Sequence, residues 1–159
     1  MPRVNYSTIL RRIGQDLESR GLKTFEINRE GAEYRVCAGY QEPPAPMPVT
    51  IRYALADIEE LERLGEEKRG TRAAAADFLS AVQVLRTIGG YLDKNQARLI
   101  RISNNESVGK DFLFRVEYET REGERVVDER AGSAIYDLCV AMYRQRGKAR
   151  RGFFGARSR

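Results

Sequence analysis

Two stretches of the chain, LRRIGQDL at residues 10–17 and LRTIGGYL at residues 85–92, place Leu, Arg, Ile, Gly and Leu in the same order. The two stretches are 75 residues apart, and the agreement continues along the chain with gaps only between the expected elements. The further matches are Ile27 with Ile102, Arg35 with Arg115, and Ile58 with Ile135. Because these matches are collinear, the sequence predicts an internal duplication.

Each copy is expected to contain a helix, three strands and a second helix. Apolar residues four apart predict a helix over 6–20, with Asn5 or Ser7 as its N-cap and Gly21 at its C-terminal end. In the first copy, alternation predicts strands over 24–28, 33–40 and 49–55, and a helix over 57–68. In the second copy, the pattern predicts a helix over 73–94, strands over 97–103, 111–120 and 125–129, a loop over 104–110, and a helix over 134–146 that Ser133 caps.

The predicted fold class is α+β, with two three-stranded antiparallel sheets that carry helices on one face and pack as a pseudo-two-fold pair. The predicted boundaries are 1–70 for the first repeat, 71–146 for the second and 147–159 for a flexible basic tail. Because about 70 residues make only a small core, we expect the two repeats to pack against each other through helices, sheet faces or strand edges.

The absent residue types limit the chemistry. The chain has no histidine, which excludes Ser-His-Asp and Cys-His catalysis and histidine-containing zinc sites, and its two cysteines are too few for a four-cysteine site. Cys37 and Cys139 both lie in apolar stretches and are expected to be buried thiols. We therefore expect no enzyme, no metal and no cofactor. Without a secretory signal or an apolar run long enough to span a membrane, a cytoplasmic location is expected.

Positive charge is concentrated at one end of the chain. Residues 144–159 hold seven of the 28 basic residues and no acidic one, so the remaining 21 basic residues face 23 acidic residues. Basic side chains that neutralise phosphates, with aromatic rings that stack on bases, are typical of nucleic-acid binding. The predicted contacts are Arg144, Arg146, Lys148, Arg150, Arg151, Phe153, Phe154, Arg157 and Arg159. The same composition suits an anionic membrane surface or a solubilising terminus.

The sheet face that points away from the helices is a second candidate site. We expect it to present Thr24, Glu26, Thr50, Leu99, Leu113 and Glu117 together with four arginines, namely Arg35, Arg52, Arg101 and Arg115. Arginines on a sheet can hold a phosphate or carboxylate in a bidentate manner. Cross-strand Arg–Glu pairs on a solvated face are the simpler interpretation.

Three functions remain open from the sequence. The leading hypothesis is a non-enzymatic module whose basic tail contacts nucleic acid or a nucleoprotein complex. The alternatives are a protein–protein adaptor or homo-oligomer that uses a sheet edge or the proline-rich loop at 43–48, and a small-ligand sensor with a pocket between the repeats lined by Tyr and Arg. The α-β-β-β-α order is similar to that of double-stranded RNA-binding domains. RAGSAIYDL at 130–138 lacks their Lys-Lys-x-Ala-Lys helix start, so the similarity is one of topology and implies no function.

Overall fold

Helices form where the four-residue apolar spacing predicts them. The computed structural model describes residues 5–67, 81–109 and 111–135. Helix α1 (Tyr6–Ser19) begins after Asn5, whose side chain accepts a hydrogen bond from the backbone N–H of Thr8, as an N-cap does. Gly21, just beyond the helix, has a φ of 75°, which confirms its predicted role at the C-terminal end.

Two further helices are described. Helix α2 (Leu55–Glu67) begins two residues earlier than predicted, and Asp57 accepts a hydrogen bond from the backbone N–H of Ala54. Helix α3 (Ala81–Lys94) covers the second half of the helix expected over 73–94, whose first eight residues lie outside the described ranges. The final predicted helix is described only over 132–135, where one helical turn forms.

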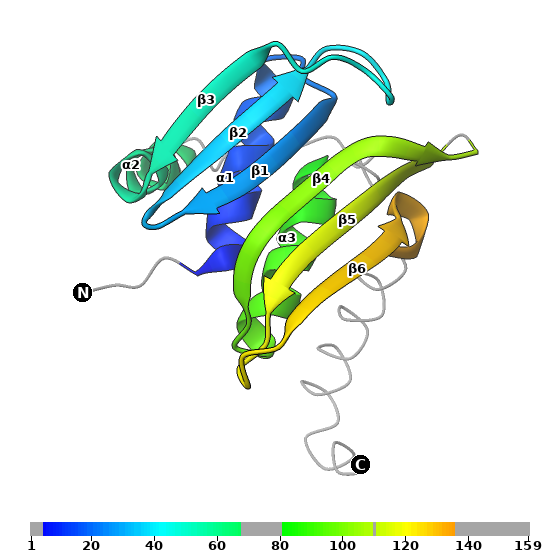
Figure 1. The fold of residues 1–159 in the computed structure, drawn as a ribbon. Helices are drawn as coiled ribbons and strands as arrows, with labels where there is room; N and C mark the ends of the chain where they lie inside the picture. The colour runs from blue at the N-terminus through cyan, green and yellow to red at the C-terminus, as the bar shows by residue number, and fades with distance from the viewer. Residues whose placement is uncertain (1–4, 68–80, 110, 136–159) are drawn as a thin grey trace, which may run out of the picture.

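The strands form one continuous sheet, so the prediction of two three-stranded sheets is wrong (Figure 1). They are β1 (Thr24–Glu30), β2 (Glu33–Gly39), β3 (Val49–Ala54), β4 (Arg98–Val108), β5 (Asp111–Glu119) and β6 (Arg125–Ala131). The order across the sheet is β3-β2-β1-β4-β5-β6, and every neighbouring pair is antiparallel. The physical reason is edge pairing. The edges of β1 and β4 satisfy each other's backbone groups, which neither could do in a separate sheet.

The pairing of β1 with β4 is short and centred on Ile27. Only Glu26, Ile27 and Asn28 have register partners in β4, namely Ser103, Ile102 and Arg101. Ile27 and Ile102 were matched in the sequence, and here they face each other. At the 75-residue offset, Glu26 matches Arg101 and Asn28 matches Ser103. Exchanging the two strands therefore turns the pair Glu26–Ser103 into the pair Arg101–Asn28, as a two-fold axis through this point requires.

Three local predictions are wrong. Residues 104–108 continue β4 instead of forming a loop. A register shift between Leu99 and Arg101 turns Leu99 into the core, where it is 1% exposed, instead of onto the open face. Thr24 is fully buried because the proline loop folds over this end of the sheet, where the Pro46 carbonyl lies against Gly39, the register partner of Thr24.

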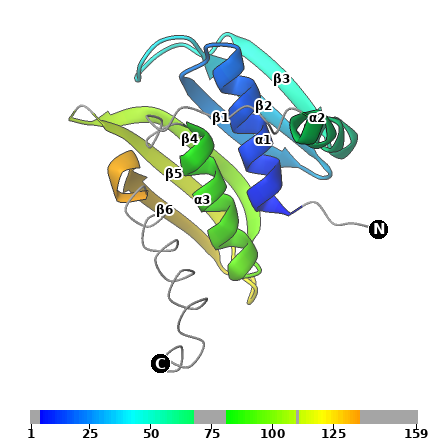
Figure 2. The ribbon, with the colours of Figure 1, turned by 180° about the vertical axis from the view of Figure 1, so that it is seen from behind.

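The helices lie on one face of the sheet, and a single core fills the space between the layers (Figure 2). Helices α1 and α3 lie side by side beneath the joined strands and pack closely against each other. Glycines allow this approach. A Cβ on Gly89 would lie 2.5 Å from the Tyr6 carbonyl oxygen, and a Cβ on Gly14 would lie 3.1 Å from Leu85. The sheet's other face is left open by the described helices. In the described ranges, no helix has the length and apolar character that crossing a membrane requires.

Candidate functional site

The four predicted arginines all lie on the open face of the sheet, each in contact with acidic side chains. In the first half, Glu30 accepts from Arg35 Nε at 2.9 Å and from Arg52 Nη1 at 3.3 Å. Arg52 also lies 3.8 Å from Glu33. These side chains are largely exposed, so the pairs contribute little to stability.

In the second half, Glu117 holds two arginines at once. Its Oε1 accepts from Arg101 at 2.6 Å and its Oε2 accepts from Arg125 at 2.7 Å, while the residue is only 6% exposed. Two hydrogen bonds lower the pKa of Glu117 below its ordinary value, and the one from Arg125 has a larger effect than the one from Arg101. Arg115 pairs with Glu129 at 2.5 Å and with Glu106 at 3.3 Å.

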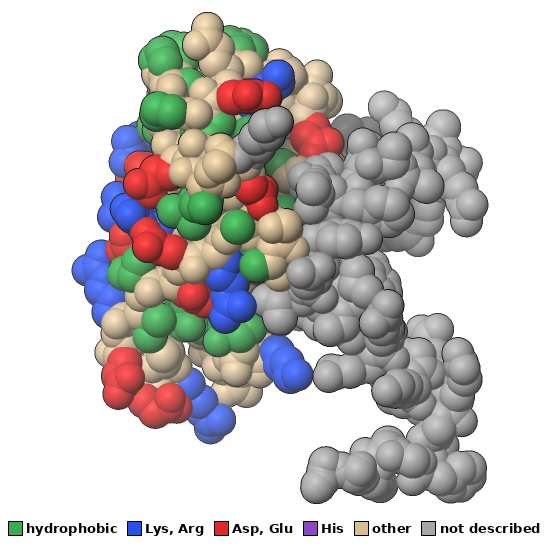
Figure 3. Space-filling model, turned by 90° about the vertical axis from the view of Figure 1, so that its right-hand side faces the viewer, with side chains coloured by type: hydrophobic (Ala, Val, Ile, Leu, Met, Phe, Trp, Pro, Cys, Tyr) green, Lys and Arg blue, Asp and Glu red, His purple; other side chains and the backbone are tan. Residues whose placement is uncertain are grey.

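The open face is therefore a ladder of alternating charges. In the space-filling view, blue and red side chains alternate down the left side, which is this face (Figure 3). All four candidate arginines form ion pairs with neighbouring glutamates, so they form no unpaired basic patch for a phosphate. The geometry agrees with the simpler interpretation of cross-strand Arg–Glu pairing.

The other predicted contacts, Arg144 to Arg159 with Phe153 and Phe154, lie outside the described residues. The described chain leads toward them through the helical turn at 132–135. Asp111, at the start of β5, accepts from the backbone N–H of Ser133 at 3.0 Å and thus caps this turn.

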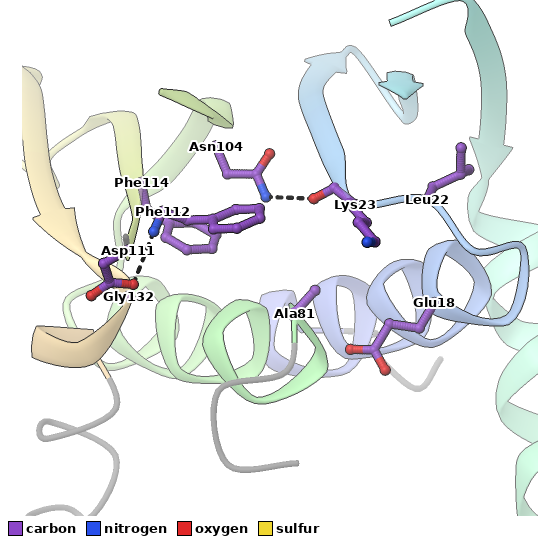
Figure 4. Close-up of a pocket in the computed structure, with 9 residues that line it drawn as sticks. All are labelled: Glu18, Leu22, Lys23, Ala81, Asn104, Asp111, Phe112, Phe114 and Gly132. Carbon is purple, nitrogen blue, oxygen red and sulfur yellow. Dashed lines mark hydrogen bonds between the residues drawn. The ribbon is translucent and has the colours of Figure 1, made fainter. Parts of the chain in front are cut away.

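Two cavities lie between the helices and the sheet, one at each end of the helix pair. The first, called here the Phe114 cavity, has a volume of about 350 Å³ (Figure 4). Phe112 and Phe114 line one side of it, and Leu22, Lys23 and Glu18 line the other (Figure 4). The buried Asn104 side chain closes its upper side, since it donates to the Lys23 carbonyl at 3.0 Å and accepts from Phe25 N at 2.7 Å.

The second cavity, called here the Tyr34 cavity, has a volume of about 390 Å³ and is more polar. Tyr34, Arg29 and Asp93 line it together with the apolar side chain of Ile9. Arg29 donates through Nε to the Leu99 carbonyl at 2.9 Å. It therefore joins β1 to β4 at this end, as Asn104 does at the other.

The two cavities occupy equivalent places in the two halves. The equivalent pairs, at the offsets found in the sequence, are Arg29 with Asn104, Tyr34 with Phe114, Ala32 with Phe112, Tyr6 with Ala81, Asp93 with Glu18, and Leu55 with Gly132. The helix caps are equivalent too. Asp93 accepts from Tyr6 N and Ser7 N, both at 3.0 Å, and Glu18 accepts from Val82 N at 3.2 Å. An acidic residue near the C-terminal end of each helix thus caps the start of the other helix.

The proline loop is fastened to the second half of the sheet. The backbone N–H and carbonyl of Ala45 both bond to the side chain of Asn105, each at 2.9 Å. The main chain of the proline-rich loop is therefore already hydrogen-bonded within the protein at Ala45. This makes the loop a weaker candidate for docking a partner protein.

Metal-ligating side chains do not cluster in the described ranges. No group of three His, Cys, Asp or Glu side chains there is arranged to hold a metal ion. Cys37, which was expected to be buried, is only half-buried, with its Sγ 4.0 Å from the Thr50 hydroxyl. Cys139 lies outside the described residues.

Sequence reasoning expected a pocket lined by Tyr and Arg but named none of its residues. The sequence patterns do not single out Arg29 or Asp93, and they predict a loop at Asn104. The 75-residue offset was the available signal, because it aligns Arg29 with Asn104 and Asp93 with Glu18. Comparison with protein-family models, curated proteins and solved structures gives no match to this chain.

Proposed function

We propose that the chain is a non-enzymatic binding module whose basic segment 144–159 contacts nucleic acid or a nucleoprotein complex. The observation that carries this proposal is the charge of the segment, with seven basic residues and no acidic one. The paired arginines of the open face support it indirectly. Because Arg35, Arg52, Arg101 and Arg115 are engaged by glutamates, the segment is the stronger candidate for a polyanion contact.

In this proposal the basic side chains bind phosphates and displace their counterions. Phe153 and Phe154 stack on unpaired bases, and the intervening glycines let the segment follow an irregular backbone. The folded body positions the segment and supplies no chemistry.

The test measures binding of a labelled single-stranded oligonucleotide by fluorescence anisotropy as the salt concentration is raised. The full chain is compared with a version ending at Arg146 and with a full-length variant in which Lys148, Arg150, Arg151, Arg157 and Arg159 are replaced by Gln. The full chain should bind with a log–log salt slope of about −3 to −5, as expected for about four to seven phosphate contacts on a single strand. Both altered chains should lose most of this slope. Binding that is independent of salt or of the tail would refute the proposal.

A protein–protein adaptor or homo-oligomer is the second candidate, and the composition of the two outer strands favours one surface for it. The outer strand β3 has one charged residue in six, whereas β6 has four in seven. Charged outer strands resist edge pairing, so β3 is the more suitable edge. A partner retained after nuclease treatment, or an oligomer seen by light scattering at all salt concentrations, would favour this candidate.

We also infer that the body arose by duplication of one α-β-β-β-α unit. The exchange-related pairing around Ile27 and Ile102, the reciprocal caps and the equivalent cavities support this inference. In this view, two copies of the unit once met as a symmetric dimer, and the fusion joined them permanently.

A further inference from the structure

The Tyr34 cavity is lined by a largely buried tyrosine whose hydroxyl the protein itself does not use. Tyr34 is 4% exposed, and its hydroxyl makes no hydrogen bond with any residue in the described ranges. Burial, with the nearby Tyr6 and Asp93, raises the pKa of Tyr34 above its ordinary value even though Arg29 opposes this. The hydroxyl therefore keeps its proton and remains a hydrogen-bond donor at any physiological pH.

Arg29 supplies further donors to the same cavity. Its Nε bonds to the Leu99 carbonyl and its Nη1 to the Gly31 carbonyl at 2.8 Å, which hold the guanidinium in place. A guanidinium has five N–H donors, so three remain. Within residues 5–67, 81–109 and 111–135, no carboxylate lies close enough to Arg29 to form an ion pair. The Arg29 guanidinium is thus held in place by two hydrogen bonds, but no acidic side chain of the described ranges pairs with its positive charge.

Asp93 limits the charge that a ligand of this cavity can carry. Both of its oxygens already accept from the first turn of α1, so the helix start is occupied and offers no anion site of its own. The carboxylate nevertheless remains a negative charge in the cavity wall. It disfavours a dianion such as hydrogen phosphate more strongly than a singly charged group.

The apolar part of the cavity leaves space for the body of a ligand. Ile9 and Leu55 form one wall, and Ala32 stands where the Phe114 cavity has the larger Phe112. The counterpart cavity thus has Phe, Phe and Asn at the positions where this one has Ala, Tyr and Arg. The two cavities share a framework, and only the Tyr34 cavity combines anchored donors with a small wall residue.

We propose that the Tyr34 cavity binds a small organic monocarboxylate, with the carboxylate held by Arg29 and the Tyr34 hydroxyl and the apolar body against Ile9 and Leu55. The site is independent of segment 144–159. It would make the module responsive to a small ligand as well as to a macromolecular partner.

The test titrates benzoate, and separately the neutral isostere benzamide, into the ¹⁵N-labelled full chain and follows the backbone amide shifts. Benzoate should shift the amides of residues 29–34 saturably, with a Kd of about 1 mM or below. Benzamide and inorganic phosphate should bind at least ten-fold more weakly. Tyr34→Phe removes only the hydroxyl and should weaken benzoate about ten-fold, as expected for a hydrogen bond to a charged group.

Two variants make the result specific to this cavity. Ala32→Phe gives it the wall of its counterpart and should abolish benzoate binding by filling the space. Phe114→Tyr places a hydroxyl in the other cavity, which lacks the arginine, and should leave benzoate binding unchanged. The absence of saturable shifts at 29–34, equal binding of benzamide, or no effect of Tyr34→Phe in a variant that melts like the original chain would each overturn the proposal.

Discussion

The two glycines that lie between α1 and α3 should respond very differently to the same substitution. Both occupy equivalent helix positions, and replacing either by Ala gains about 1 kcal/mol of helix propensity. At Gly89, the new Cβ would meet main chain, with the Tyr6 carbonyl oxygen at 2.5 Å and Ser7 N at 2.6 Å. At Gly14, it would meet the end of the Leu85 side chain at 3.1 Å and the Val82 Cα at 3.2 Å.

The magnitude follows from what must move. An ordinary contact begins near 3.4 Å, so Gly89→Ala requires α1 and α3 to separate by close to 1 Å at this crossing. Overpacking of this kind costs about 1–3 kcal/mol. The same displacement stretches the two hydrogen bonds that Asp93 makes to Tyr6 and Ser7, at about 1 kcal/mol each. After the propensity gain, we expect Gly89→Ala to lower the free energy of unfolding by about 3 kcal/mol.

Urea unfolding followed by circular dichroism measures this loss. With an m-value of about 2 kcal/mol per molar, the midpoint for Gly89→Ala should fall by about 1.5 M. Gly14→Ala is the matched control and should change the free energy of unfolding by less than about 1 kcal/mol, because the Leu85 side chain can turn away. If both variants unfold at the midpoint of the original chain, the close main-chain approach at Gly89 is wrong.

Substitutions at three further positions test other parts of the body. Asn104→Ala should cost about 2–4 kcal/mol in urea unfolding, because it leaves the buried Phe25 N–H and the part-buried Lys23 carbonyl unpaired. Asn104→Asp should not fully restore the loss, because its carboxylate can accept from Phe25 but cannot donate to Lys23. Thr24→Val should leave the midpoint unchanged or raise it, since the buried Thr24 hydroxyl has no partner within the described ranges; a clear loss would reveal one. Because Arg125 and Arg101 lower the pKa of Glu117, its contribution is present above about pH 4.5 and is lost as the pH falls through the lowered value. The difference in free energy of unfolding between the original chain and Glu117→Gln should therefore decrease between about pH 5 and pH 3. A difference that stays constant over this range would contradict the pairing of Glu117 with the two arginines.

The spacing of apolar residues predicted the helices and strands well because each of them buries one apolar face of its own. Ile9, Ile13 and Leu17 are all buried, as their spacing along α1 requires. The alternation of β2 likewise buries Tyr34, Val36 and Ala38. These patterns depend only on which face of an element points inward.

The joining of the two halves could not be predicted from such patterns. A strand edge carries backbone groups that are the same in every residue, so nothing in β1 identifies β4 as its partner. Leu99 shows a related limit. One extra residue in β4 reverses the alternation, and a bulge leaves no compositional signal in the stretch RLIRIS.

The charged open face was predicted, but its pairings were not. Arg101 and Arg115 were placed on the correct side by alternation. Which glutamates they meet depends on the register between strands, and register is set by the turns and bulges. The cavities depend on contacts between residues 70 to 90 positions apart, such as Arg29 with Leu99, which local patterns do not encode.

The short seam between β1 and β4 has a consequence during synthesis on the ribosome. Strand β1 and the inner face of α1 emerge about 70 residues before β4, their partner in the finished fold. Throughout that interval the nascent first half presents an unpaired strand edge. Another chain on the same messenger RNA offers the same strand edges. Two such chains can therefore form a domain-swapped dimer, in which β1 of one chain pairs with β4 of the other through the contacts of the monomer. Slower elongation between residues 40 and 98 would increase the yield of this dimer.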